Sequence, residues 1–265
     1  MPGPLLLIGC GKMGGALLQG WIQKGAQPSH IHVVKAHPNK GHLPQGVNIY
    51  ASPDELRINP AIIVIAAKPQ ILGEILPHYK RYQHSLFISV AAGRERAFYK
   101  AILGNHVKIV RVMPNTPALI GSGMTVLHRA KDISEMDMAS TGALMEAVGE
   151  IAWIEEEAML HPVTALSGGG PAYLFLFIEA LGAAGIKAGL PADLSMRLAR
   201  KTVEGSALLS QSSNEALANM RQAVTSPKGT TIEALHVLMR GGNGLEALLT
   251  EALLAASDRS KELAK

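Results

Sequence analysis

Residues 5–14 read LLLIGCGKMG, and this stretch decides the fold. Four apolar residues lead directly into Gly9, Gly11 and Gly14, and apolar residues at helical spacing begin at Met13. A strand that enters a helix through a GxGxxG loop is typical of dinucleotide-binding proteins, because the glycines let the backbone approach a pyrophosphate at the helix N-terminus. We therefore predict a dinucleotide site here. The alternative is a tight structural turn without a ligand.

The first half of the chain alternates short apolar runs with helical patterns. Helical patterns follow the first run and Pro69, and the predicted strands are residues 5–8, 31–34, 62–66, 86–90, 107–112, 124–127 and 151–154. Apolar runs separated by helices indicate βαβ units and a mostly parallel sheet. The fold class that we predict for residues 1–157 is α/β, a doubly wound Rossmann-type domain.

The character of the sequence changes after residue 157. Ser212 with Glu215, and Thr230 with Glu233, match the capping-box pattern of helix starts. No further strand-like run follows, and the predicted helical segments are 158–165, 171–188, 191–211, 213–224 and 230–262, the last with a break at Gly241–Gly242. We therefore predict an all-helical second domain over residues 158–265.

Composition restricts the function classes. A net charge of +4 is spread along the 265 residues without a basic block, so we expect no nucleic-acid partner. The single Cys10 excludes an internal disulfide and a cysteine-based zinc site, which favours a reducing, cytoplasmic compartment. The ten histidines show no metal-ligand spacing, so we predict no metal.

The most apolar stretch is residues 171–190. It contains Glu179 and Lys187 and is interrupted by glycines. These features favour a buried helix over a membrane span, so we expect no membrane partner.

The segment after the second predicted strand bears on the choice of cofactor. NAD sites usually carry an acidic residue about 20 residues beyond the glycines, which binds the ribose 2′-hydroxyl. Residues 33–40 read VVKAHPNK, with Lys35, His37 and Lys40 and no carboxylate. Cations suit a 2′-phosphate, so we predict NADPH, with NADH as a second choice. The alternative is that the lysines are ordinary solvated loop charges.

Five segments stand out by their order and spacing. They are GCGKMGGAL (9–17), AAKPQ (66–70), VRVMPNTPALIGSG (110–123), TALSGGGPAYLF (164–175) and VTSPKGTTIEALHVL (224–238). Together they resemble the pyrroline-5-carboxylate reductase family, and the likeness covers essentially the whole chain. The resemblance implies an oxidoreductase that transfers hydride from NAD(P)H to the imine carbon of 1-pyrroline-5-carboxylate, giving L-proline in the last step of proline biosynthesis.

The resemblance also implies which residues hold the two ligands. Those for the cofactor are Gly9, Gly11, Lys12, Met13, Gly14, Lys35, His37, Ala66, Lys68, Pro69, Ala92, Gly93 and Asn115, with Ala92, Gly93 and Asn115 near the nicotinamide. Those for the substrate are Ser226, Gly229, Thr230, Thr231 and Glu157.

Reduction of a cyclic imine needs a bound reductant, an anchor for the substrate carboxylate and a hydrogen-bonding group at the imine nitrogen. The turn 226–231 opens a predicted helix, whose unpaired N–H groups and positive dipole end suit a carboxylate. We predict Thr231 as the catalytic residue, with its hydroxyl orienting the protonated iminium and not supplying the proton. The alternative is that Thr230 is only an N-cap and Thr231 only a first-turn residue.

The helix that begins near Pro171 predicts self-association. Residues 173–178 read YLFLFI and are apolar around nearly the whole circumference, whereas a helix on the surface of a monomer shows a polar stripe. The resemblance implies a domain-interwoven homodimer, often gathered into a decamer. In that dimer the SPKGTT turn of one chain faces the nicotinamide bound to the other.

Two other functions stay open. A related two-domain hydroxyacid dehydrogenase would need a general base, and such enzymes resemble one another in carrying a lysine early in the helix after the glycine-rich segment. In this chain the first lysine of that helix is Lys187. A non-catalytic dinucleotide-sensing paralogue is supported by Gly169 and Lys228, which stand where the family usually has serine and glycine.

Overall fold

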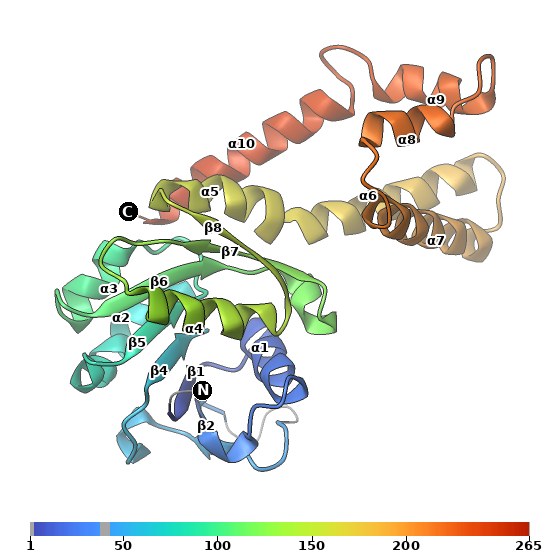
Figure 1. The fold of residues 1–265 in the computed structure, drawn as a ribbon. Coiled ribbons are helices and arrows are strands. Elements are labelled where there is room, and N and C mark those ends of the chain that lie inside the picture. Colours follow the sequence, from blue (N-terminus) through green and yellow to red (C-terminus); the bar gives the residue numbers. More distant parts are fainter. Residues whose placement is uncertain (1–2, 38–42, 265) are drawn as a thin grey trace. The chain divides into compact units, whose positions relative to one another are not determined.

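The computed structural model describes residues 3–37 and 43–264 (Figure 1). The chain divides into two compact units: the residues up to Gly169 together with those from Ala256 onward, and Gly170–Ala255. This division differs from the predicted one at residues 157 and 158, because residues 158–169 and the end of the last helix pack with the sheet. The units are defined by contacts alone, so the functional boundary between residues 157 and 158 stays a prediction.

One eight-stranded sheet forms the centre of the first unit. Its order is β3-β2-β1-β4-β5-β6-β7-β8, and neighbouring strands are parallel except for β6 and β7. The strands are β1 (Leu5–Ile8), β2 (Ile31–Val34), β3 (Asn48–Tyr50), β4 (Ile62–Ile65), β5 (Leu86–Ser89), β6 (Lys108–Met113), β7 (Gly123–His128) and β8 (Gly149–Ile154). The chain changes direction across the sheet between β1 and β4, so the doubly wound α/β fold class is confirmed.

Strands β1 and β4 are apolar throughout because both faces of the sheet are covered. In β1, Leu5 and Leu7 belong to one hydrophobic core, and Leu6 and Ile8 belong to the other. Helices α1 (Lys12–Gln23) and α4 (Glu135–Glu146) cover the first core. The second core is covered by α2 (Leu72–Ile75), the 3-10 segment Leu76–Tyr82 and α3 (Arg96–Leu103). This alternation is the reason that continuous apolar runs predict strands of a parallel sheet.

The seven predicted strands are confirmed to within two residues at each end. The strand that the sequence did not predict is β3, a three-residue edge strand without an apolar run. Helices α3 and α4 were not predicted either. The helical pattern after Pro69 forms only the four-residue α2, flanked by 3-10 turns.

The described residues of the second unit form helices and the loops between them. Leading into it, α5 (Leu160–Val163) and the π-helical turn Thr164–Gly168 belong to the first unit. The remaining helices are α6 (Gly170–Lys187), α7 (Ala192–Gln211), α8 (Leu217–Ala223), α9 (Thr230–Leu238) and α10 (Leu245–Ala264), of which α10 ends in the first unit. The all-helical prediction is therefore confirmed.

Both predicted capping boxes are wrong. Ser212 ends α7 and donates its hydroxyl to the Leu209 carbonyl at 2.9 Å, and α8 begins only at Leu217. At α9 the N-cap is Gly229 and Thr230 is the first helical residue, with no side-chain cap. The first-turn N–H groups of α9 therefore keep their capacity to bind an anion.

The apolar helix α6 is not buried within the single chain. Gly182 is its one buried residue, while Phe175 and Leu176 are 62% and 65% exposed. The prediction of a buried helix is therefore wrong for an isolated chain. By length and composition alone, the helical stretch Glu157–Lys187 is long and apolar enough to cross a membrane. An exposed apolar surface of this size marks an interaction site.

Three histidines of the first unit, His32, His128 and His161, are buried. Desolvation lowers the pKa of each below the ordinary 6.5, because burial disfavours the charged imidazolium. For His161 the Arg111 charge lowers the pKa further, and Glu95 opposes that shift. These imidazoles are therefore neutral in the folded protein at neutral pH.

Acid should destabilise the folded chain through these histidines. As the pH falls through about 6.5, these histidines become protonated in the unfolded chain but stay neutral in the folded chain. The free energy of unfolding therefore falls by at most about 1.4 kcal/mol per pH unit for each histidine. Urea unfolding at about pH 7.5 and pH 5.5 measures the loss. His128→Gln should reduce it, because the Gln amide can still donate to the Glu155 carbonyl that His128 contacts at 3.1 Å. An undiminished loss in this variant would contradict the assignment to His128.

Candidate functional site

A cleft of about 730 Å³ lies at the carboxyl ends of β1, β2 and β4. Doubly wound sheets bind their ligands at this edge, where the strand order reverses. The lining comes from residues 8–11, 34–37, 51–53 and 66–68, with Ile71, Ile75, His78 and Tyr79. Of the predicted cofactor residues, the cleft brings together Gly9, Gly11, Lys35, His37, Ala66 and Lys68.

The glycine loop has the geometry that a pyrophosphate site needs. Gly9 has φ +84°, and a Cβ there would lie 2.9 Å from the Ala66 carbonyl oxygen. A Cβ on Gly14 would lie 2.5 Å from the Gly9 carbonyl oxygen, so α1 packs directly against the loop. Gly11 is the N-cap of α1, and the space on its Cβ side is open. The loop therefore leaves room for a phosphate at the helix N-terminus.

The ionisable amines and imidazoles of the cleft favour an anion. Lys35, His37, Lys68 and His78 line it, and the described lining contains no Asp or Glu. Burial raises the pKa of the Cys10 thiol, and the Lys35 charge opposes that shift, which places Lys35 electrostatically close to the glycine loop. The third predicted cation, Lys40, lies outside the described residues.

The other predicted cofactor residues do not line this cleft. Lys12 and Met13 begin α1 directly behind the loop, and Pro69 begins the 3-10 turn after Lys68. The Ala92–Gly93 turn follows β5, farther along the same sheet edge, and Gly93 has φ +68°. Their contacts with a cofactor stay predictions.

The carboxamide of Asn115 is engaged within the first unit. Its Oδ1 accepts a hydrogen bond from the Met124 backbone N–H at 2.9 Å, and its Nδ2 donates to Ser167 Oγ at 3.2 Å. Asn115 thus connects the start of β7 with the π-helical turn. Its predicted place near the nicotinamide stays a prediction.

Glu157 also has partners within the first unit. Its Oε1 accepts hydrogen bonds from Arg111 Nη1 at 2.9 Å and from the Arg96 backbone N–H at the start of α3 at 2.7 Å. Arg111 is only 4% exposed, and a buried guanidinium needs such a partner. The carboxylate therefore has a structural role that sequence reasoning missed. An arginine inside the buried strand β6 was the signal for it.

The predicted substrate turn begins α9 in the second unit. Lys228 has φ +63°, the one positive φ of a non-glycine among residues 3–37 and 43–264, so it adopts the conformation expected of a glycine. A Cβ on Gly229 would collide with Ser226 Oγ, so a larger residue here would require the Ser226 side chain to move. Thr230 and Thr231 are exposed at the open first turn. The turn can therefore accept a carboxylate.

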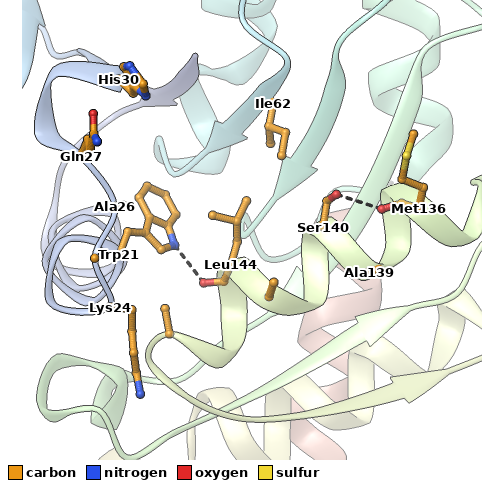
Figure 2. A pocket seen from close by; sticks show the side chains of 13 residues that line it. Trp21, Lys24, Ala26, Gln27, His30, Ile62, Met136, Ala139, Ser140 and Leu144 are labelled. Atoms are coloured by element: carbon orange, nitrogen blue, oxygen red, sulfur yellow. Dashed lines mark hydrogen bonds between the residues drawn. The ribbon is translucent and has the colours of Figure 1, made fainter. Parts of the chain in front are cut away.

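A second cavity, of about 780 Å³, lies between α1 and α4 (Figure 2). The Trp21 indole in its lining donates to the Leu144 carbonyl at 2.9 Å. Ile62, also in the lining, is the first residue of β4, so the cavity lies at the amino edge of the sheet. None of the predicted site residues lines it. In the described part of the chain, no group of three or more His, Cys, Asp or Glu side chains is placed to hold a metal ion.

Comparisons with known proteins agree with this geometry. The family model for pyrroline-5-carboxylate reductase dimerisation matches residues 157–263, and a model for coenzyme F420-dependent NADP oxidoreductases matches residues 5–93. The pyrroline-5-carboxylate reductase of Pseudomonas aeruginosa is 36% identical over 98% of this chain and 97% of its own length.

Solved structures extend the similarity to the fold of the whole chain. A pyrroline-5-carboxylate reductase from Coxiella burnetii has a TM-score of 0.89 at 32% identity and covers 100% of both chains. The enzyme from Plasmodium falciparum, solved with NADP bound, has a TM-score of 0.86 at 31% identity and covers 100% of this chain and 99% of its own. The exposed apolar surface of α6 lies in the matched dimerisation region, which accounts for it by self-association. The chain therefore belongs to the pyrroline-5-carboxylate reductase family.

Proposed function

We propose that this chain reduces 1-pyrroline-5-carboxylate to L-proline with NADPH, as a cytoplasmic homodimer. The observation that carries the proposal is the extent of the family likeness, 36% identity over 98% of the chain, which spans both the glycine-loop cleft and the turn that begins α9. A cleft alone would support any dinucleotide enzyme, whereas the two features together fit an enzyme that also holds a small carboxylate.

The residues of the cleft fit a phosphorylated dinucleotide. The open space at Gly11 and the N-terminus of α1 suit the pyrophosphate. Lys35 and His37 suit a 2′-phosphate, since no carboxylate among the described lining residues would repel it. When bound there, NADPH supplies the hydride and the protein orients it.

In the proposed reaction the first-turn N–H groups of α9 hold the substrate carboxylate. The Thr231 hydroxyl hydrogen-bonds at the ring nitrogen and orients the protonated iminium. Hydride adds to the imine carbon and forms a C–H bond, while the π electron pair of the C=N bond moves to the nitrogen. That nitrogen already carries its proton, so the product is the amine of proline and no side chain has to act as an acid in this step.

The test is NADPH oxidation with racemic 1-pyrroline-5-carboxylate, with a 2-oxo acid, or with no substrate. We expect turnover with the first alone. Turnover with the 2-oxo acid would instead identify a hydroxyacid dehydrogenase, and NADPH binding without turnover would identify a sensing paralogue.

The cofactor proposal predicts a higher kcat/KM with NADPH than with NADH. Lys35→Glu should lower kcat/KM for NADPH about tenfold to a hundredfold, since loss of a charge-assisted bond costs about 1.5–3 kcal/mol. Lys24→Glu is the matched control, because it makes the same charge change at the far end of α1, about 18 Å from the loop. Equal efficiencies with both cofactors, unchanged by Lys35→Glu, would remove the basis for NADPH.

The oligomer that we propose is an interwoven homodimer, with a decamer of five dimers as a higher state. It is supported by the apolar surface of α6 and by the match of residues 157–263 to a dimerisation region. Native mass spectrometry should find even-numbered assemblies and no stable monomer.

A further inference from the structure

The last turn of α10 lies against the loop that connects β5 to α3. A Cβ on Gly93 would lie only 3.0 Å from Leu263 Cβ, so the absence of a side chain lets the two backbones approach. Gly93 is buried and has φ +68°, a conformation that other residues rarely adopt. The contact joins positions 170 residues apart, and both belong to the first unit.

A second contact holds the same turn of α10 in place. Ser260 Oγ and His161 Nδ1 are 2.9 Å apart, and the two residues are 6% and 5% exposed. On the other side of the imidazole, Nε2 lies 3.8 Å from Glu95 Oε1, two residues after Gly93. The end of α10 is thus connected to the β5–α3 loop both directly and through His161.

The position of this loop on the sheet gives the contacts a functional meaning. The pyrophosphate site follows β1, and the cations for the 2′-phosphate follow β2, so the adenosine half of a dinucleotide extends toward β2. The other half must extend in the opposite direction along the carboxyl edge, across β4 to β5. The Ala92–Gly93 turn lies at the carboxyl end of β5, where the nicotinamide half arrives.

We propose that the last turn of α10, held by the Ser260–His161 hydrogen bond and packed on Gly93, is a positioning element for the nicotinamide half of the cofactor. The inference rests on the proposed function, because it assumes that a nicotinamide dinucleotide occupies the cleft. Ser260, His161 and Leu263 act through the Ala92–Gly93 turn and are positioning residues.

The test compares NADPH with adenosine 2′,5′-bisphosphate, which has the adenosine half and lacks the nicotinamide half. Calorimetry on the oligomeric enzyme should show that Ser260→Ala weakens NADPH binding about threefold to tenfold. The affinity of this variant for the bisphosphate should stay within about twofold of the parent's. A chain that ends at Ser260 should likewise bind NADPH more weakly and bind the bisphosphate like the parent. It should still fold, because Lys261, Glu262 and Leu263 are exposed. Ser260→Thr, which keeps the hydroxyl, should bind NADPH like the parent.

Glu262→Ala is the control for changes at the helix end, because this carboxylate pairs with Arg259 on the exposed surface. Parent-like NADPH binding by both Ser260→Ala and the shortened chain would overturn the inference, and so would equal weakening of both ligands, which indicates general loosening. A parent that binds no NADPH would instead refute the proposed function.

Turnover offers a second readout, independent of binding affinity. With NADPH deuterated at the transferred hydrogen, the primary isotope effect on kcat should rise in Ser260→Ala, because a misplaced nicotinamide slows hydride transfer relative to product release. KM for 1-pyrroline-5-carboxylate should stay within about twofold. An unchanged isotope effect together with an unchanged kcat would count against the positioning role.

Discussion

Mixing two inactive variants should restore activity if the active site is built from two chains. Gly11→Asp places a carboxylate where we propose that the pyrophosphate binds, and Ser226→Ala with Thr231→Ala removes hydroxyls from the proposed substrate turn. Each variant should be nearly inactive as a homodimer. After co-refolding, about half of the dimers are mixed and hold one intact composite site, so about a quarter of the parent activity should return.

The matched control uses a chain that carries Gly11→Asp, Ser226→Ala and Thr231→Ala together. Its mixed dimers with Gly11→Asp contain no intact site in either arrangement, so they should stay inactive. If the first mixture also stays inactive although native mass spectrometry detects mixed dimers, each site lies within one chain and the interwoven arrangement is wrong.

Thr231→Ala should lower kcat about tenfold to a hundredfold in a folded enzyme, because a hydrogen bond to a charged partner is worth about 1.5–3 kcal/mol. Thr231→Ser keeps the hydroxyl and should retain most of the activity. Steady-state kinetics and thermal unfolding separate catalysis from stability.

Thr225→Ala is the matched control for this prediction. Its hydroxyl lies just before the substrate turn and already donates to the Arg221 carbonyl at 2.7 Å, so its loss should change stability more than turnover. If Thr231→Ala and Thr231→Ser were both as active as the parent, Thr231 would be only a first-turn residue of α9.

Local sequence was sufficient where one short stretch carries a whole structural unit. Residues 5–14 predicted β1, the loop and the start of α1, because a strand, three glycines and a helix follow one another without a gap. Lys228, in contrast, stands where the family usually has glycine, and the structure has φ +63° there.

Local patterns failed where an element or a partner is defined by distant residues. The edge strand β3 is three residues long and becomes a strand only by pairing with β2. Ser212 and Thr230 matched capping boxes, yet α8 begins later and Gly229 takes the N-cap of α9. His78 and Tyr79, which line the cleft, carry no local signal for that role.

The sequence by itself determined the doubly wound sheet, the helical second half, the glycine loop and the family, because these follow from periodicity and short motifs whose residues are neighbours in the chain. Only the tertiary structure decided the pairing of Arg111 with Glu157, the His161–Ser260 hydrogen bond across 99 positions and the approach of Leu263 to Gly93. Such contacts join residues that are separated by many helices or strands, and no local sequence pattern indicates which distant residue will be the partner. A buried charge or imidazole shows that a partner must exist, while the topology decides which residue it is.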